Sequence, residues 1–353
     1  MKKDIGTIKM GLTFAGCFLG AGYVSGKELW QYFGSYGAMG FAGLFLAVLL
    51  LVVITAVIMW IVLKSGKEAM DDIISPWDSP FIKGFFSWVG IFLFFSIGAI
   101  MTAGIGGLFV SLLRVPAWVG CLIVSALGAF VAYKGLEGMV AVFSKSVPFL
   151  VAATIIISVA RLISIGPPGI DFSEVSVNPM LGPWPLSAVN YMALNIDGSI
   201  ALLGPLAKKV NGGLRNAIGG AAIGGAGLLI MAVLIMLSVA GTPGVVDEEL
   251  PMLMVAKTVG PLALWVYGVL IFLAMFGVTQ SSMVAVVSNL EIKRIITGRK
   301  KLIFVCVLGT LNFLASLLGF SNLVRHVYPV FGYVELVSVV FLLINAVKLK
   351  KAG

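Results

Sequence analysis

The sequence predicts an all-α polytopic membrane protein with ten transmembrane helices. Of the 353 residues, 60% are apolar and only 11% are charged, whereas soluble domains carry about 25% charged residues. The mean hydropathy is +1.09, and long apolar runs recur along the whole chain. Because a spanning helix takes about 20 apolar residues, we expect about ten spans in a single transmembrane domain, residues 1–353.

Each expected span is an apolar run that ends at charged or turn-forming residues. Most of the 24 basic residues lie between these runs, on the side that the chain shares with its amino terminus. Since basic loops stay inside, we expect a multi-pass protein of the cell (inner) membrane with both termini in the cytoplasm. The spans are expected at 8–34, 38–64, 83–113, 116–133, 138–164, 184–208, 214–240, 262–290, 301–318 and 320–347.

Several function classes are disfavoured by composition. The net charge of +9 comes from short basic clusters between spans, which set topology and do not form a nucleic-acid-binding stripe. Cys17, Cys121 and Cys306 lie singly in apolar runs, and His326 is the only histidine. The sequence therefore offers no disulfide framework, zinc site or nucleophile constellation, and we expect neither an enzyme nor a cofactor other than a possible Na⁺.

The spans divide into two halves, residues 8–164 and 184–347. Five spans in each half make the second half inverted relative to the first. The first and sixth spans are interrupted at corresponding places, so we expect a five-plus-five inverted repeat with both of these helices broken. The interruptions comprise Gly20, Ala21 and Gly22 in one half, and Asn195, Ile196, Asp197 and Gly198 in the other.

A helix broken inside a bilayer exposes peptide groups, which persist only in protein or beside a cavity. The amino end of the second half-helix, near Gly22, suits a carboxylate; close helix packing is the alternative. Asp197 suits a substrate ammonium, a cation or a coupling proton; the alternative is a structural bond to a neighbouring helix or to the pair of Lys27 and Glu28. Between spans seven and eight, an amphipathic helix is expected in 241–261.

In the eighth span, Val278, Ser281 and Ser282 share one helix face. Their oxygens suit a weakly bound monovalent cation such as Na⁺. Serine hydroxyls in membrane helices also bond to carbonyls of their own helix, and that alternative stays open.

The segment 19–28, Leu-Gly-Ala-Gly-Tyr-Val-Ser-Gly-Lys-Glu, resembles the first-helix signature of the amino acid–polyamine–organocation superfamily, whose members have the LeuT-type inverted-repeat fold. Through segments 191–205 and 327–333, the whole chain also resembles the YkvI-type amino-acid permeases. This resemblance covers nearly all of the ten spans.

The resemblance implies roles for particular residues. A substrate carboxylate would meet the N–H groups of Ala21, Gly22 and Tyr23, and a substrate amine would meet carbonyls from Ala193 to Asp197. Proton-coupled relatives place a lysine of the fifth helix where others bind sodium; here that lysine is Lys145, which could instead extend to the cytoplasmic surface. The implied sodium ligands are Gly16, Leu19, Val278, Ser281 and Ser282.

These observations predict a secondary active transporter of an amino acid or a related small zwitterion or amine, coupled to Na⁺ or H⁺ and working by alternating access. The expected partners are a small-molecule substrate and membrane lipid. A monomer is compatible with the sequence, which does not fix the oligomeric state. A passive channel or facilitator for a small polar solute stays open as the alternative, and saturation of the flux distinguishes the two.

Overall fold

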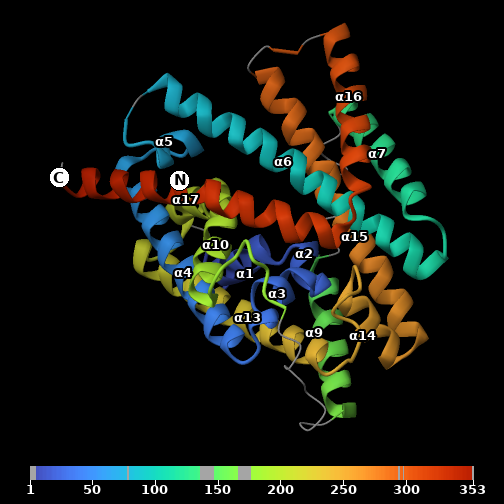
Figure 1. Cartoon of the computed structure of the whole chain (residues 1–353). Helices are drawn as coiled ribbons and strands as arrows, with labels where there is room; N and C mark the ends of the chain where they lie inside the picture. Colours follow the sequence, from blue (N-terminus) through green and yellow to red (C-terminus); the bar gives the residue numbers. More distant parts are fainter. Residues whose placement is uncertain are drawn as a thin grey trace.

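The computed structural model describes residues 5–77, 79–135, 147–165, 176–292, 295–296 and 298–351. The described chain is almost entirely helical, and its long helices run in several directions (Figure 1). The helical elements, including short 3-10 and π segments, are α1 Thr7–Phe18, α2 Ala21–Ser25, α3 Lys27–Tyr32, η1 Gly34–Tyr36, α4 Met39–Ser65, α5 Met70–Ile74, α6 Pro80–Leu108, η2 Phe109–Leu113, α7 Ala117–Lys134, α9 Val147–Ile165, α10 Trp184–Leu194, α11 Ile196–Gly198, η4 Ser199–Leu203, α12 Gly204–Leu206, η5 Ala207–Lys209, α13 Gly213–Ala240, α14 Pro251–Val259, α15 Pro261–Ile292, α16 Arg299–Ser316 and α17 Phe320–Lys351.

Among the described residues, eight helical segments are long and apolar enough to cross a membrane, so the chain is a multi-pass membrane protein. Their limits follow the apolar runs of the sequence, because bilayer thickness sets the length of a spanning helix. These segments are Met39–Ser65, Pro80–Leu113, Ala117–Lys134, Pro148–Ile165, Trp184–Lys209, Gly213–Ala240, Pro261–Glu291 and Phe320–Lys351.

Two expected spans differ from these eight. The run expected at 8–34 is divided into α1, α2 and α3, none of which is long enough alone. The run expected at 301–318 forms α16, but Arg299, Lys300 and Lys301 occupy its first turn and shorten its apolar part. The beginning of the fifth expected span, 138–146, lies outside the described residues. The helix expected within 241–261 is α14.

Several helix pairs pack along each other. α1 lies against α13, α6 against α15, and α7 against α16; α7 and α16 stand together at one corner of the molecule (Figure 1). Small residues allow the closest of these approaches. A Cβ at Gly224 of α13 would meet the backbone carbonyl of Gly11 in α1. Glycines therefore fix how near α1 comes to α13.

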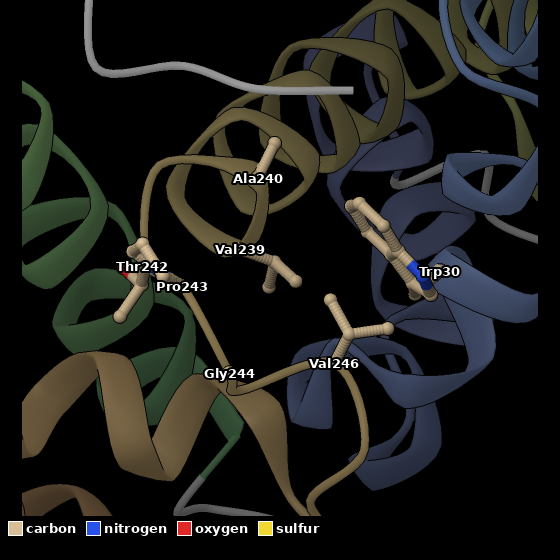
Figure 2. A pocket seen from close by; sticks show the side chains of 7 residues that line it. All are labelled: Trp30, Val239, Ala240, Thr242, Pro243, Gly244 and Val246. Atoms are coloured by element: carbon tan, nitrogen blue, oxygen red, sulfur yellow. The ribbon is translucent and has the colours of Figure 1, made fainter. Parts of the chain in front are cut away.

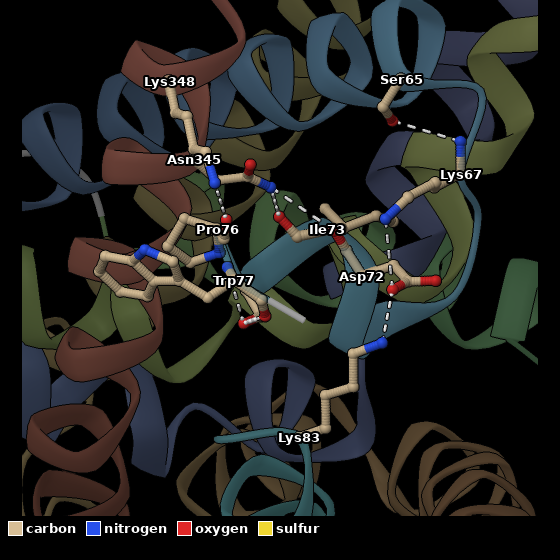
Figure 3. Close-up of polar contacts among 10 residues, drawn as sticks. Ser65, Lys67, Asp72, Ile73, Pro76, Trp77, Lys83, Asn345 and Lys348 are labelled. Carbon is tan, nitrogen blue, oxygen red and sulfur yellow. Dashed lines mark hydrogen bonds and ion pairs between the residues drawn. The ribbon is translucent and has the colours of Figure 1, made fainter. Parts of the chain in front are cut away.

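The connection between α4 and α6 is tied to the end of α17 (Figure 3). The Asn345 amide donates to the Ile73 carbonyl at 2.8 Å, and the Lys348 ammonium donates to the Pro76 carbonyl at 2.8 Å. Asp72 forms ion pairs with Lys83 at 2.9 Å and Lys67 at 3.6 Å. These bonds join α5 to α17 and α6 on the side of the molecule where α4 ends.

Candidate functional site

The chain leaves the helical conformation between α1 and α2. α1 ends at Phe18, and Gly20 is extended, with φ −82° and ψ 170°. Within α2 the first intrahelical bond runs from the Val24 N–H to the Gly20 carbonyl, at 3.2 Å. The N–H groups of Ala21, Gly22 and Tyr23 are therefore those that a helix start leaves open for capping or for a ligand.

Three side-chain hydrogen bonds involve α2 and its neighbours. The Tyr267 hydroxyl of α15 donates to the Val24 carbonyl at 2.8 Å, and the Tyr23 hydroxyl donates to the Leu228 carbonyl of α13 at 2.7 Å. The Ser25 hydroxyl donates to the Gly22 carbonyl at 2.6 Å. An interruption inside a membrane protein needs such partners, and the two tyrosine bonds fix α2 between α13 and α15.

The second interruption lies at Asn195. This residue ends α10 with φ −100° and ψ 6°, and its N–H bonds to the Met192 carbonyl at 3.2 Å. Its side-chain amide donates to the Tyr191 carbonyl at 2.9 Å. The chain continues through α11 and the π turn η4, so the departure from regular helix is shorter here than between α1 and α2.

The two interruptions are in contact. A Cβ added at Gly198 would lie 2.7 Å from Cys17 Sγ and 4.0 Å from the Phe18 ring. One face of α1 leads to this contact: Ile8 and Leu12 are each 71% exposed, and the glycines at 16 and 20 continue the face. In the described part of the chain, nothing beyond the local backbone lies within 4 Å of the Cβ position at either glycine.

A buried carboxylate lies beside α2. A Cβ at Gly22 would stand 2.5 Å from Glu28 Oε2 and 3.5 Å from the Tyr328 hydroxyl. The Tyr191 hydroxyl is within hydrogen-bonding reach of the same carboxylate. Glu28 is 7% exposed. Four tyrosine hydroxyls lie near enough to this carboxylate to interact with it electrostatically: those of Tyr23, Tyr32, Tyr191 and Tyr328.

Two further acids lie near each other, one on α11 and one on α17. Asp197 and Glu335 are close enough for their charges to interact. Asp197 Oδ1 and Glu335 Oε2 are buried and have no hydrogen-bond partner among the described residues. Asp197 does not bond to Lys27, since that ammonium donates to the Val246 carbonyl at 2.8 Å and the Glu248 carbonyl at 3.0 Å.

The serines expected to bind sodium contact α15 itself and α6. The Ser281 hydroxyl donates to the Val278 carbonyl of its own helix at 2.9 Å. Ser282 is buried with its Cβ 3.5 Å from the Cβ position of Gly98, which belongs to α6. Neither contact is with Gly16 of α1 or with Leu19, the residue that follows α1. Lys145 is outside the described residues.

α3 and the turn that follows α13 enclose two small cavities. Trp30 and Val246 face each other across a cavity of about 50 Å³, which Figure 2 shows beneath the end of α13. A neighbouring cavity of about 80 Å³ is lined by Lys27, Asp247 and Arg325, among others. Lys27 therefore lines this cavity and also bonds to the turn that follows α13.

Sequence reasoning did not assign Glu28 or Glu335 to the site. Both are carboxylates within predicted spans, and an acid at membrane depth is by itself a signal of function. What the sequence did not supply was their surroundings. Tyr191 and Tyr328 reach Glu28 from α10 and α17, far along the chain.

Comparison with known proteins supports the fold and the resemblance. No family model matches the chain. Over 340 residues it is 28% identical to the uncharacterized membrane protein YkvI of Bacillus subtilis (strain 168), covering 93% of this chain and 92% of that protein. The chain is similar to the YkvI-type membrane proteins. It is also 23% identical to protein YyaD of the same organism, over 96% of each chain. The resemblance expected from the sequence is confirmed.

Solved structures show the fold. A mutant of the manganese transporter of Eremococcus coleocola matches with a TM-score of 0.61 at 14% identity, covering 95% of this chain and 78% of that one. The inward-facing conformation of Mhp1 matches with a TM-score of 0.56 at 14% identity, covering 92% and 76%. The chain therefore has a LeuT-type fold, shared with transport proteins.

Proposed function

We propose that the protein is a secondary active transporter of an amino acid or a related small zwitterion or amine, coupled to Na⁺ or H⁺ and working by alternating access. The observation that carries this proposal is the contact of Gly198 with Cys17, which brings two helix interruptions together. The unpartnered carboxylate of Asp197 stands next to that contact. Interrupted helices that meet in a LeuT-type fold form a substrate site near the bilayer midplane.

The architecture that we propose is ten spans in two inverted halves, 8–164 and 184–347, with the first and sixth spans broken. Corresponding helices have similar lengths, which supports the repeat. α4 and α13 have 27 and 28 residues, α6 and α15 have 29 and 32, and α7 and α16 both have 18. α1 to α3 then make the first span, and α10 to η5 make the sixth.

The substrate would lie between the two interruptions. We expect peptide groups at Gly20, Ala21, Gly22 and Tyr23 to contact it on one side, and those at Ala193, Asn195 and Gly198 to contact it on the other. Such groups bind small polar solutes without a metal or cofactor. The site lies within one chain, so a monomer suffices for transport.

For the coupling ion, two sets of residues compete. The pair of Asp197 and Glu335 offers two unpartnered carboxylate oxygens that suit H⁺ or a cation. In the sodium site that the resemblance implies, the Ser281 hydroxyl donates to the Val278 carbonyl, and both oxygens keep a lone pair for a cation. Transport under an imposed Na⁺ gradient or pH gradient distinguishes the two sets.

The exposed face of α1 is the route by which we propose that the site communicates with the cytoplasm. It runs from Ile8 to Gly20, while Lys27 bonds close the other side. If both termini lie in the cytoplasm, as the basic residues predict, this face opens to the cytoplasm and the structure is the inward-facing state. Rocking of the broken helices against their neighbours would open the other side.

Uptake by proteoliposomes tests the proposal. A thermal-shift screen of amino acids and amines first selects a ligand, because a ligand that binds only the folded protein raises its stability. The labelled ligand is then offered under an imposed Na⁺ gradient or pH gradient. We expect saturable accumulation that one of the gradients drives. Flux that rises linearly with concentration and ignores both gradients would instead show a passive channel.

A further inference from the structure

Glu28 is a buried acid at the site that pairs with no basic side chain among the described residues. Only 7% of the residue is exposed. Its neighbour in sequence, Lys27, donates instead to the Val246 and Glu248 carbonyls. Protein surrounds the Glu28 carboxylate, and the Tyr191 hydroxyl is within hydrogen-bonding reach of it. Among the described residues, no basic side chain interacts with this carboxylate.

The groups around Glu28 come from every element packed on it. They are tyrosines from α2, α3, α10 and α17, together with Met101 of α6, whose Cε lies 3.6 Å from the Cβ position of Gly22. Two of these hydroxyls have other acceptors: Tyr23 donates to the Leu228 carbonyl, and Tyr32 donates to Asn190 Oδ1 at 3.1 Å. The wall around Glu28 is therefore aromatic and uncharged.

An ionised carboxylate in such a place is costly unless a positive charge lies beside it. The empty site therefore favours the protonated, neutral acid. A bound cation reverses this preference, because it supplies the missing partner for the carboxylate, and aromatic side chains also attract cations. Glu28 can thus hold a proton or a cation, but not both.

The same geometry disfavours a substrate carboxylate at α2. Glu28 Oε2 lies 2.5 Å from the Cβ position of Gly22, next to the N–H groups that the resemblance assigns to a carboxylate. Two acids of the chain, Asp197 and Glu335, lie at the neighbouring interruption. Acids at these three positions gain a stabilising partner when a positive group binds and none when an anionic group binds.

We propose that Glu28 binds a proton and a protonated amine alternately, so that the transporter exchanges protons for an organic amine without a carboxylate. On binding, the ammonium group pairs with the Glu28 carboxylate, and the proton of the carboxylic acid leaves to water. No covalent bond other than this O–H bond breaks. The inference rests on the proposed function and narrows its substrate and its coupling ion.

Proton release on binding tests the inference without transport. Purified protein in weakly buffered detergent with a pH indicator is titrated with ethylamine, isopentylamine and phenethylamine. Alanine, leucine and phenylalanine differ from them only by the added carboxylate. We expect at least one amine to bind and to release up to one proton per amine bound, the fraction rising as the pH falls. The matching amino acid should bind more weakly and release fewer protons.

Variants locate the effect. Glu28→Gln should abolish proton release and weaken amine binding on the order of tenfold or more, because a charge partner is lost. Glu28→Asp keeps the charge and should retain proton release. Glu291→Gln is the control, since this acid pairs with Lys301 at 2.9 Å and is 37% exposed; its binding should equal that of wild type. Gel filtration and thermal unfolding check that each variant is folded.

Three results would overturn the inference: no amine binds to wild type, an amine binds without proton release at every pH, or Glu28→Gln and Glu28→Asp both behave like wild type. The proposed function fails differently. Binding with proton release but no flux in proteoliposomes would contradict transport alone. Accumulation of an amino acid by a protein that binds no amine would contradict the role of Glu28 alone.

Discussion

Gly198 of α11 packs against Cys17 of α1 so closely that a Cβ at position 198 would stand 2.7 Å from the Cys17 sulfur. The two residues are far apart in sequence, and each belongs to an interruption of a helix. Their contact makes the two interruptions parts of one site. It also means that the distance between α1 and α11 is set by the absence of a side chain at residue 198.

We expect Gly198→Ala to push α11 away from α1. Overpacking of this kind costs about 1 to 3 kcal/mol of stability, and it should also reduce uptake because the substrate site lies between the displaced segments. The melting temperature and the initial uptake rate measure the two effects.

Cys17→Ala provides the matched control. Alone it should leave uptake near the wild-type value, and combined with Gly198→Ala it should restore much of the loss, because it removes the sulfur that the added methyl group meets. Equal losses in the single and the double variant would show that the contact does not limit activity.

Asp197 and Glu335 carry unpartnered carboxylate oxygens and repel each other. Asp197→Asn introduces an amide donor for the Glu335 carboxylate, so we expect the melting temperature to rise. Substrate accumulation should nevertheless fall, as in Glu335→Gln, because the site loses an acid that can pair with a positive group.

Ser281→Ala separates this pair from the sodium alternative. If the pair carries the coupling cation, the serine variant should accumulate substrate like wild type. Unchanged uptake and unchanged ion dependence in both Asp197→Asn and Ser281→Ala would show that our site is wrongly placed.

Lys27 holds the turn after α13 through two carbonyls. Lys27→Met keeps the aliphatic stem and removes both bonds, so the amides of residues 244–250 should exchange hydrogen faster. Mass spectrometry of the exchanged peptides measures this. Lys257→Met, at an exposed lysine of α14, is the control and should leave exchange unchanged; equal rates in the Lys27 variant and wild type would contradict the closing role of Lys27.

A pH effect is expected at the connection before α6. The hydrogen bond from Lys83, with the nearby charge of Lys67, lowers the pKa of the Asp72 carboxyl below its usual value. A lowered pKa in the folded state stabilises the protein above the unfolded pKa, about 3.9, and the gain is lost as the pH falls through the folded pKa. The melting-temperature difference between wild type and Asp72→Asn should therefore be constant near neutral pH and vanish in acid. Lys83→Met should shrink it, and a difference that grows in acid would contradict this account.

The spans were predictable because the bilayer fixes their length. The runs expected at 116–133 and 214–240 became α7, Ala117–Lys134, and α13, Gly213–Ala240, each within one residue at either end. The glycine-rich segment in the first run was also a usable signal, since only certain places tolerate extended backbone at membrane depth.

The surroundings of the acids were not predictable from one sequence. Lys27 and Glu28 are adjacent, and sequence analysis considered them as one pair. Successive residues of a helix point about 100° apart, so Lys27 reaches the turn after α13 while Glu28 faces Gly22. The same rotation separates Ser281 from Ser282. Which side each residue faces depends on tertiary packing.

Sided labelling at Gly16 tests alternating access most directly. A side chain fits there, because nothing beyond the local backbone lies within 4 Å of its Cβ position in the described part of the chain. In a variant that lacks Cys17, Cys121 and Cys306, we predict that Gly16→Cys reacts with a membrane-impermeant thiol reagent from the cytoplasmic side alone, and more slowly once the transported substrate is bound. Equal reaction from both sides, or a rate that no substrate changes, would contradict the account.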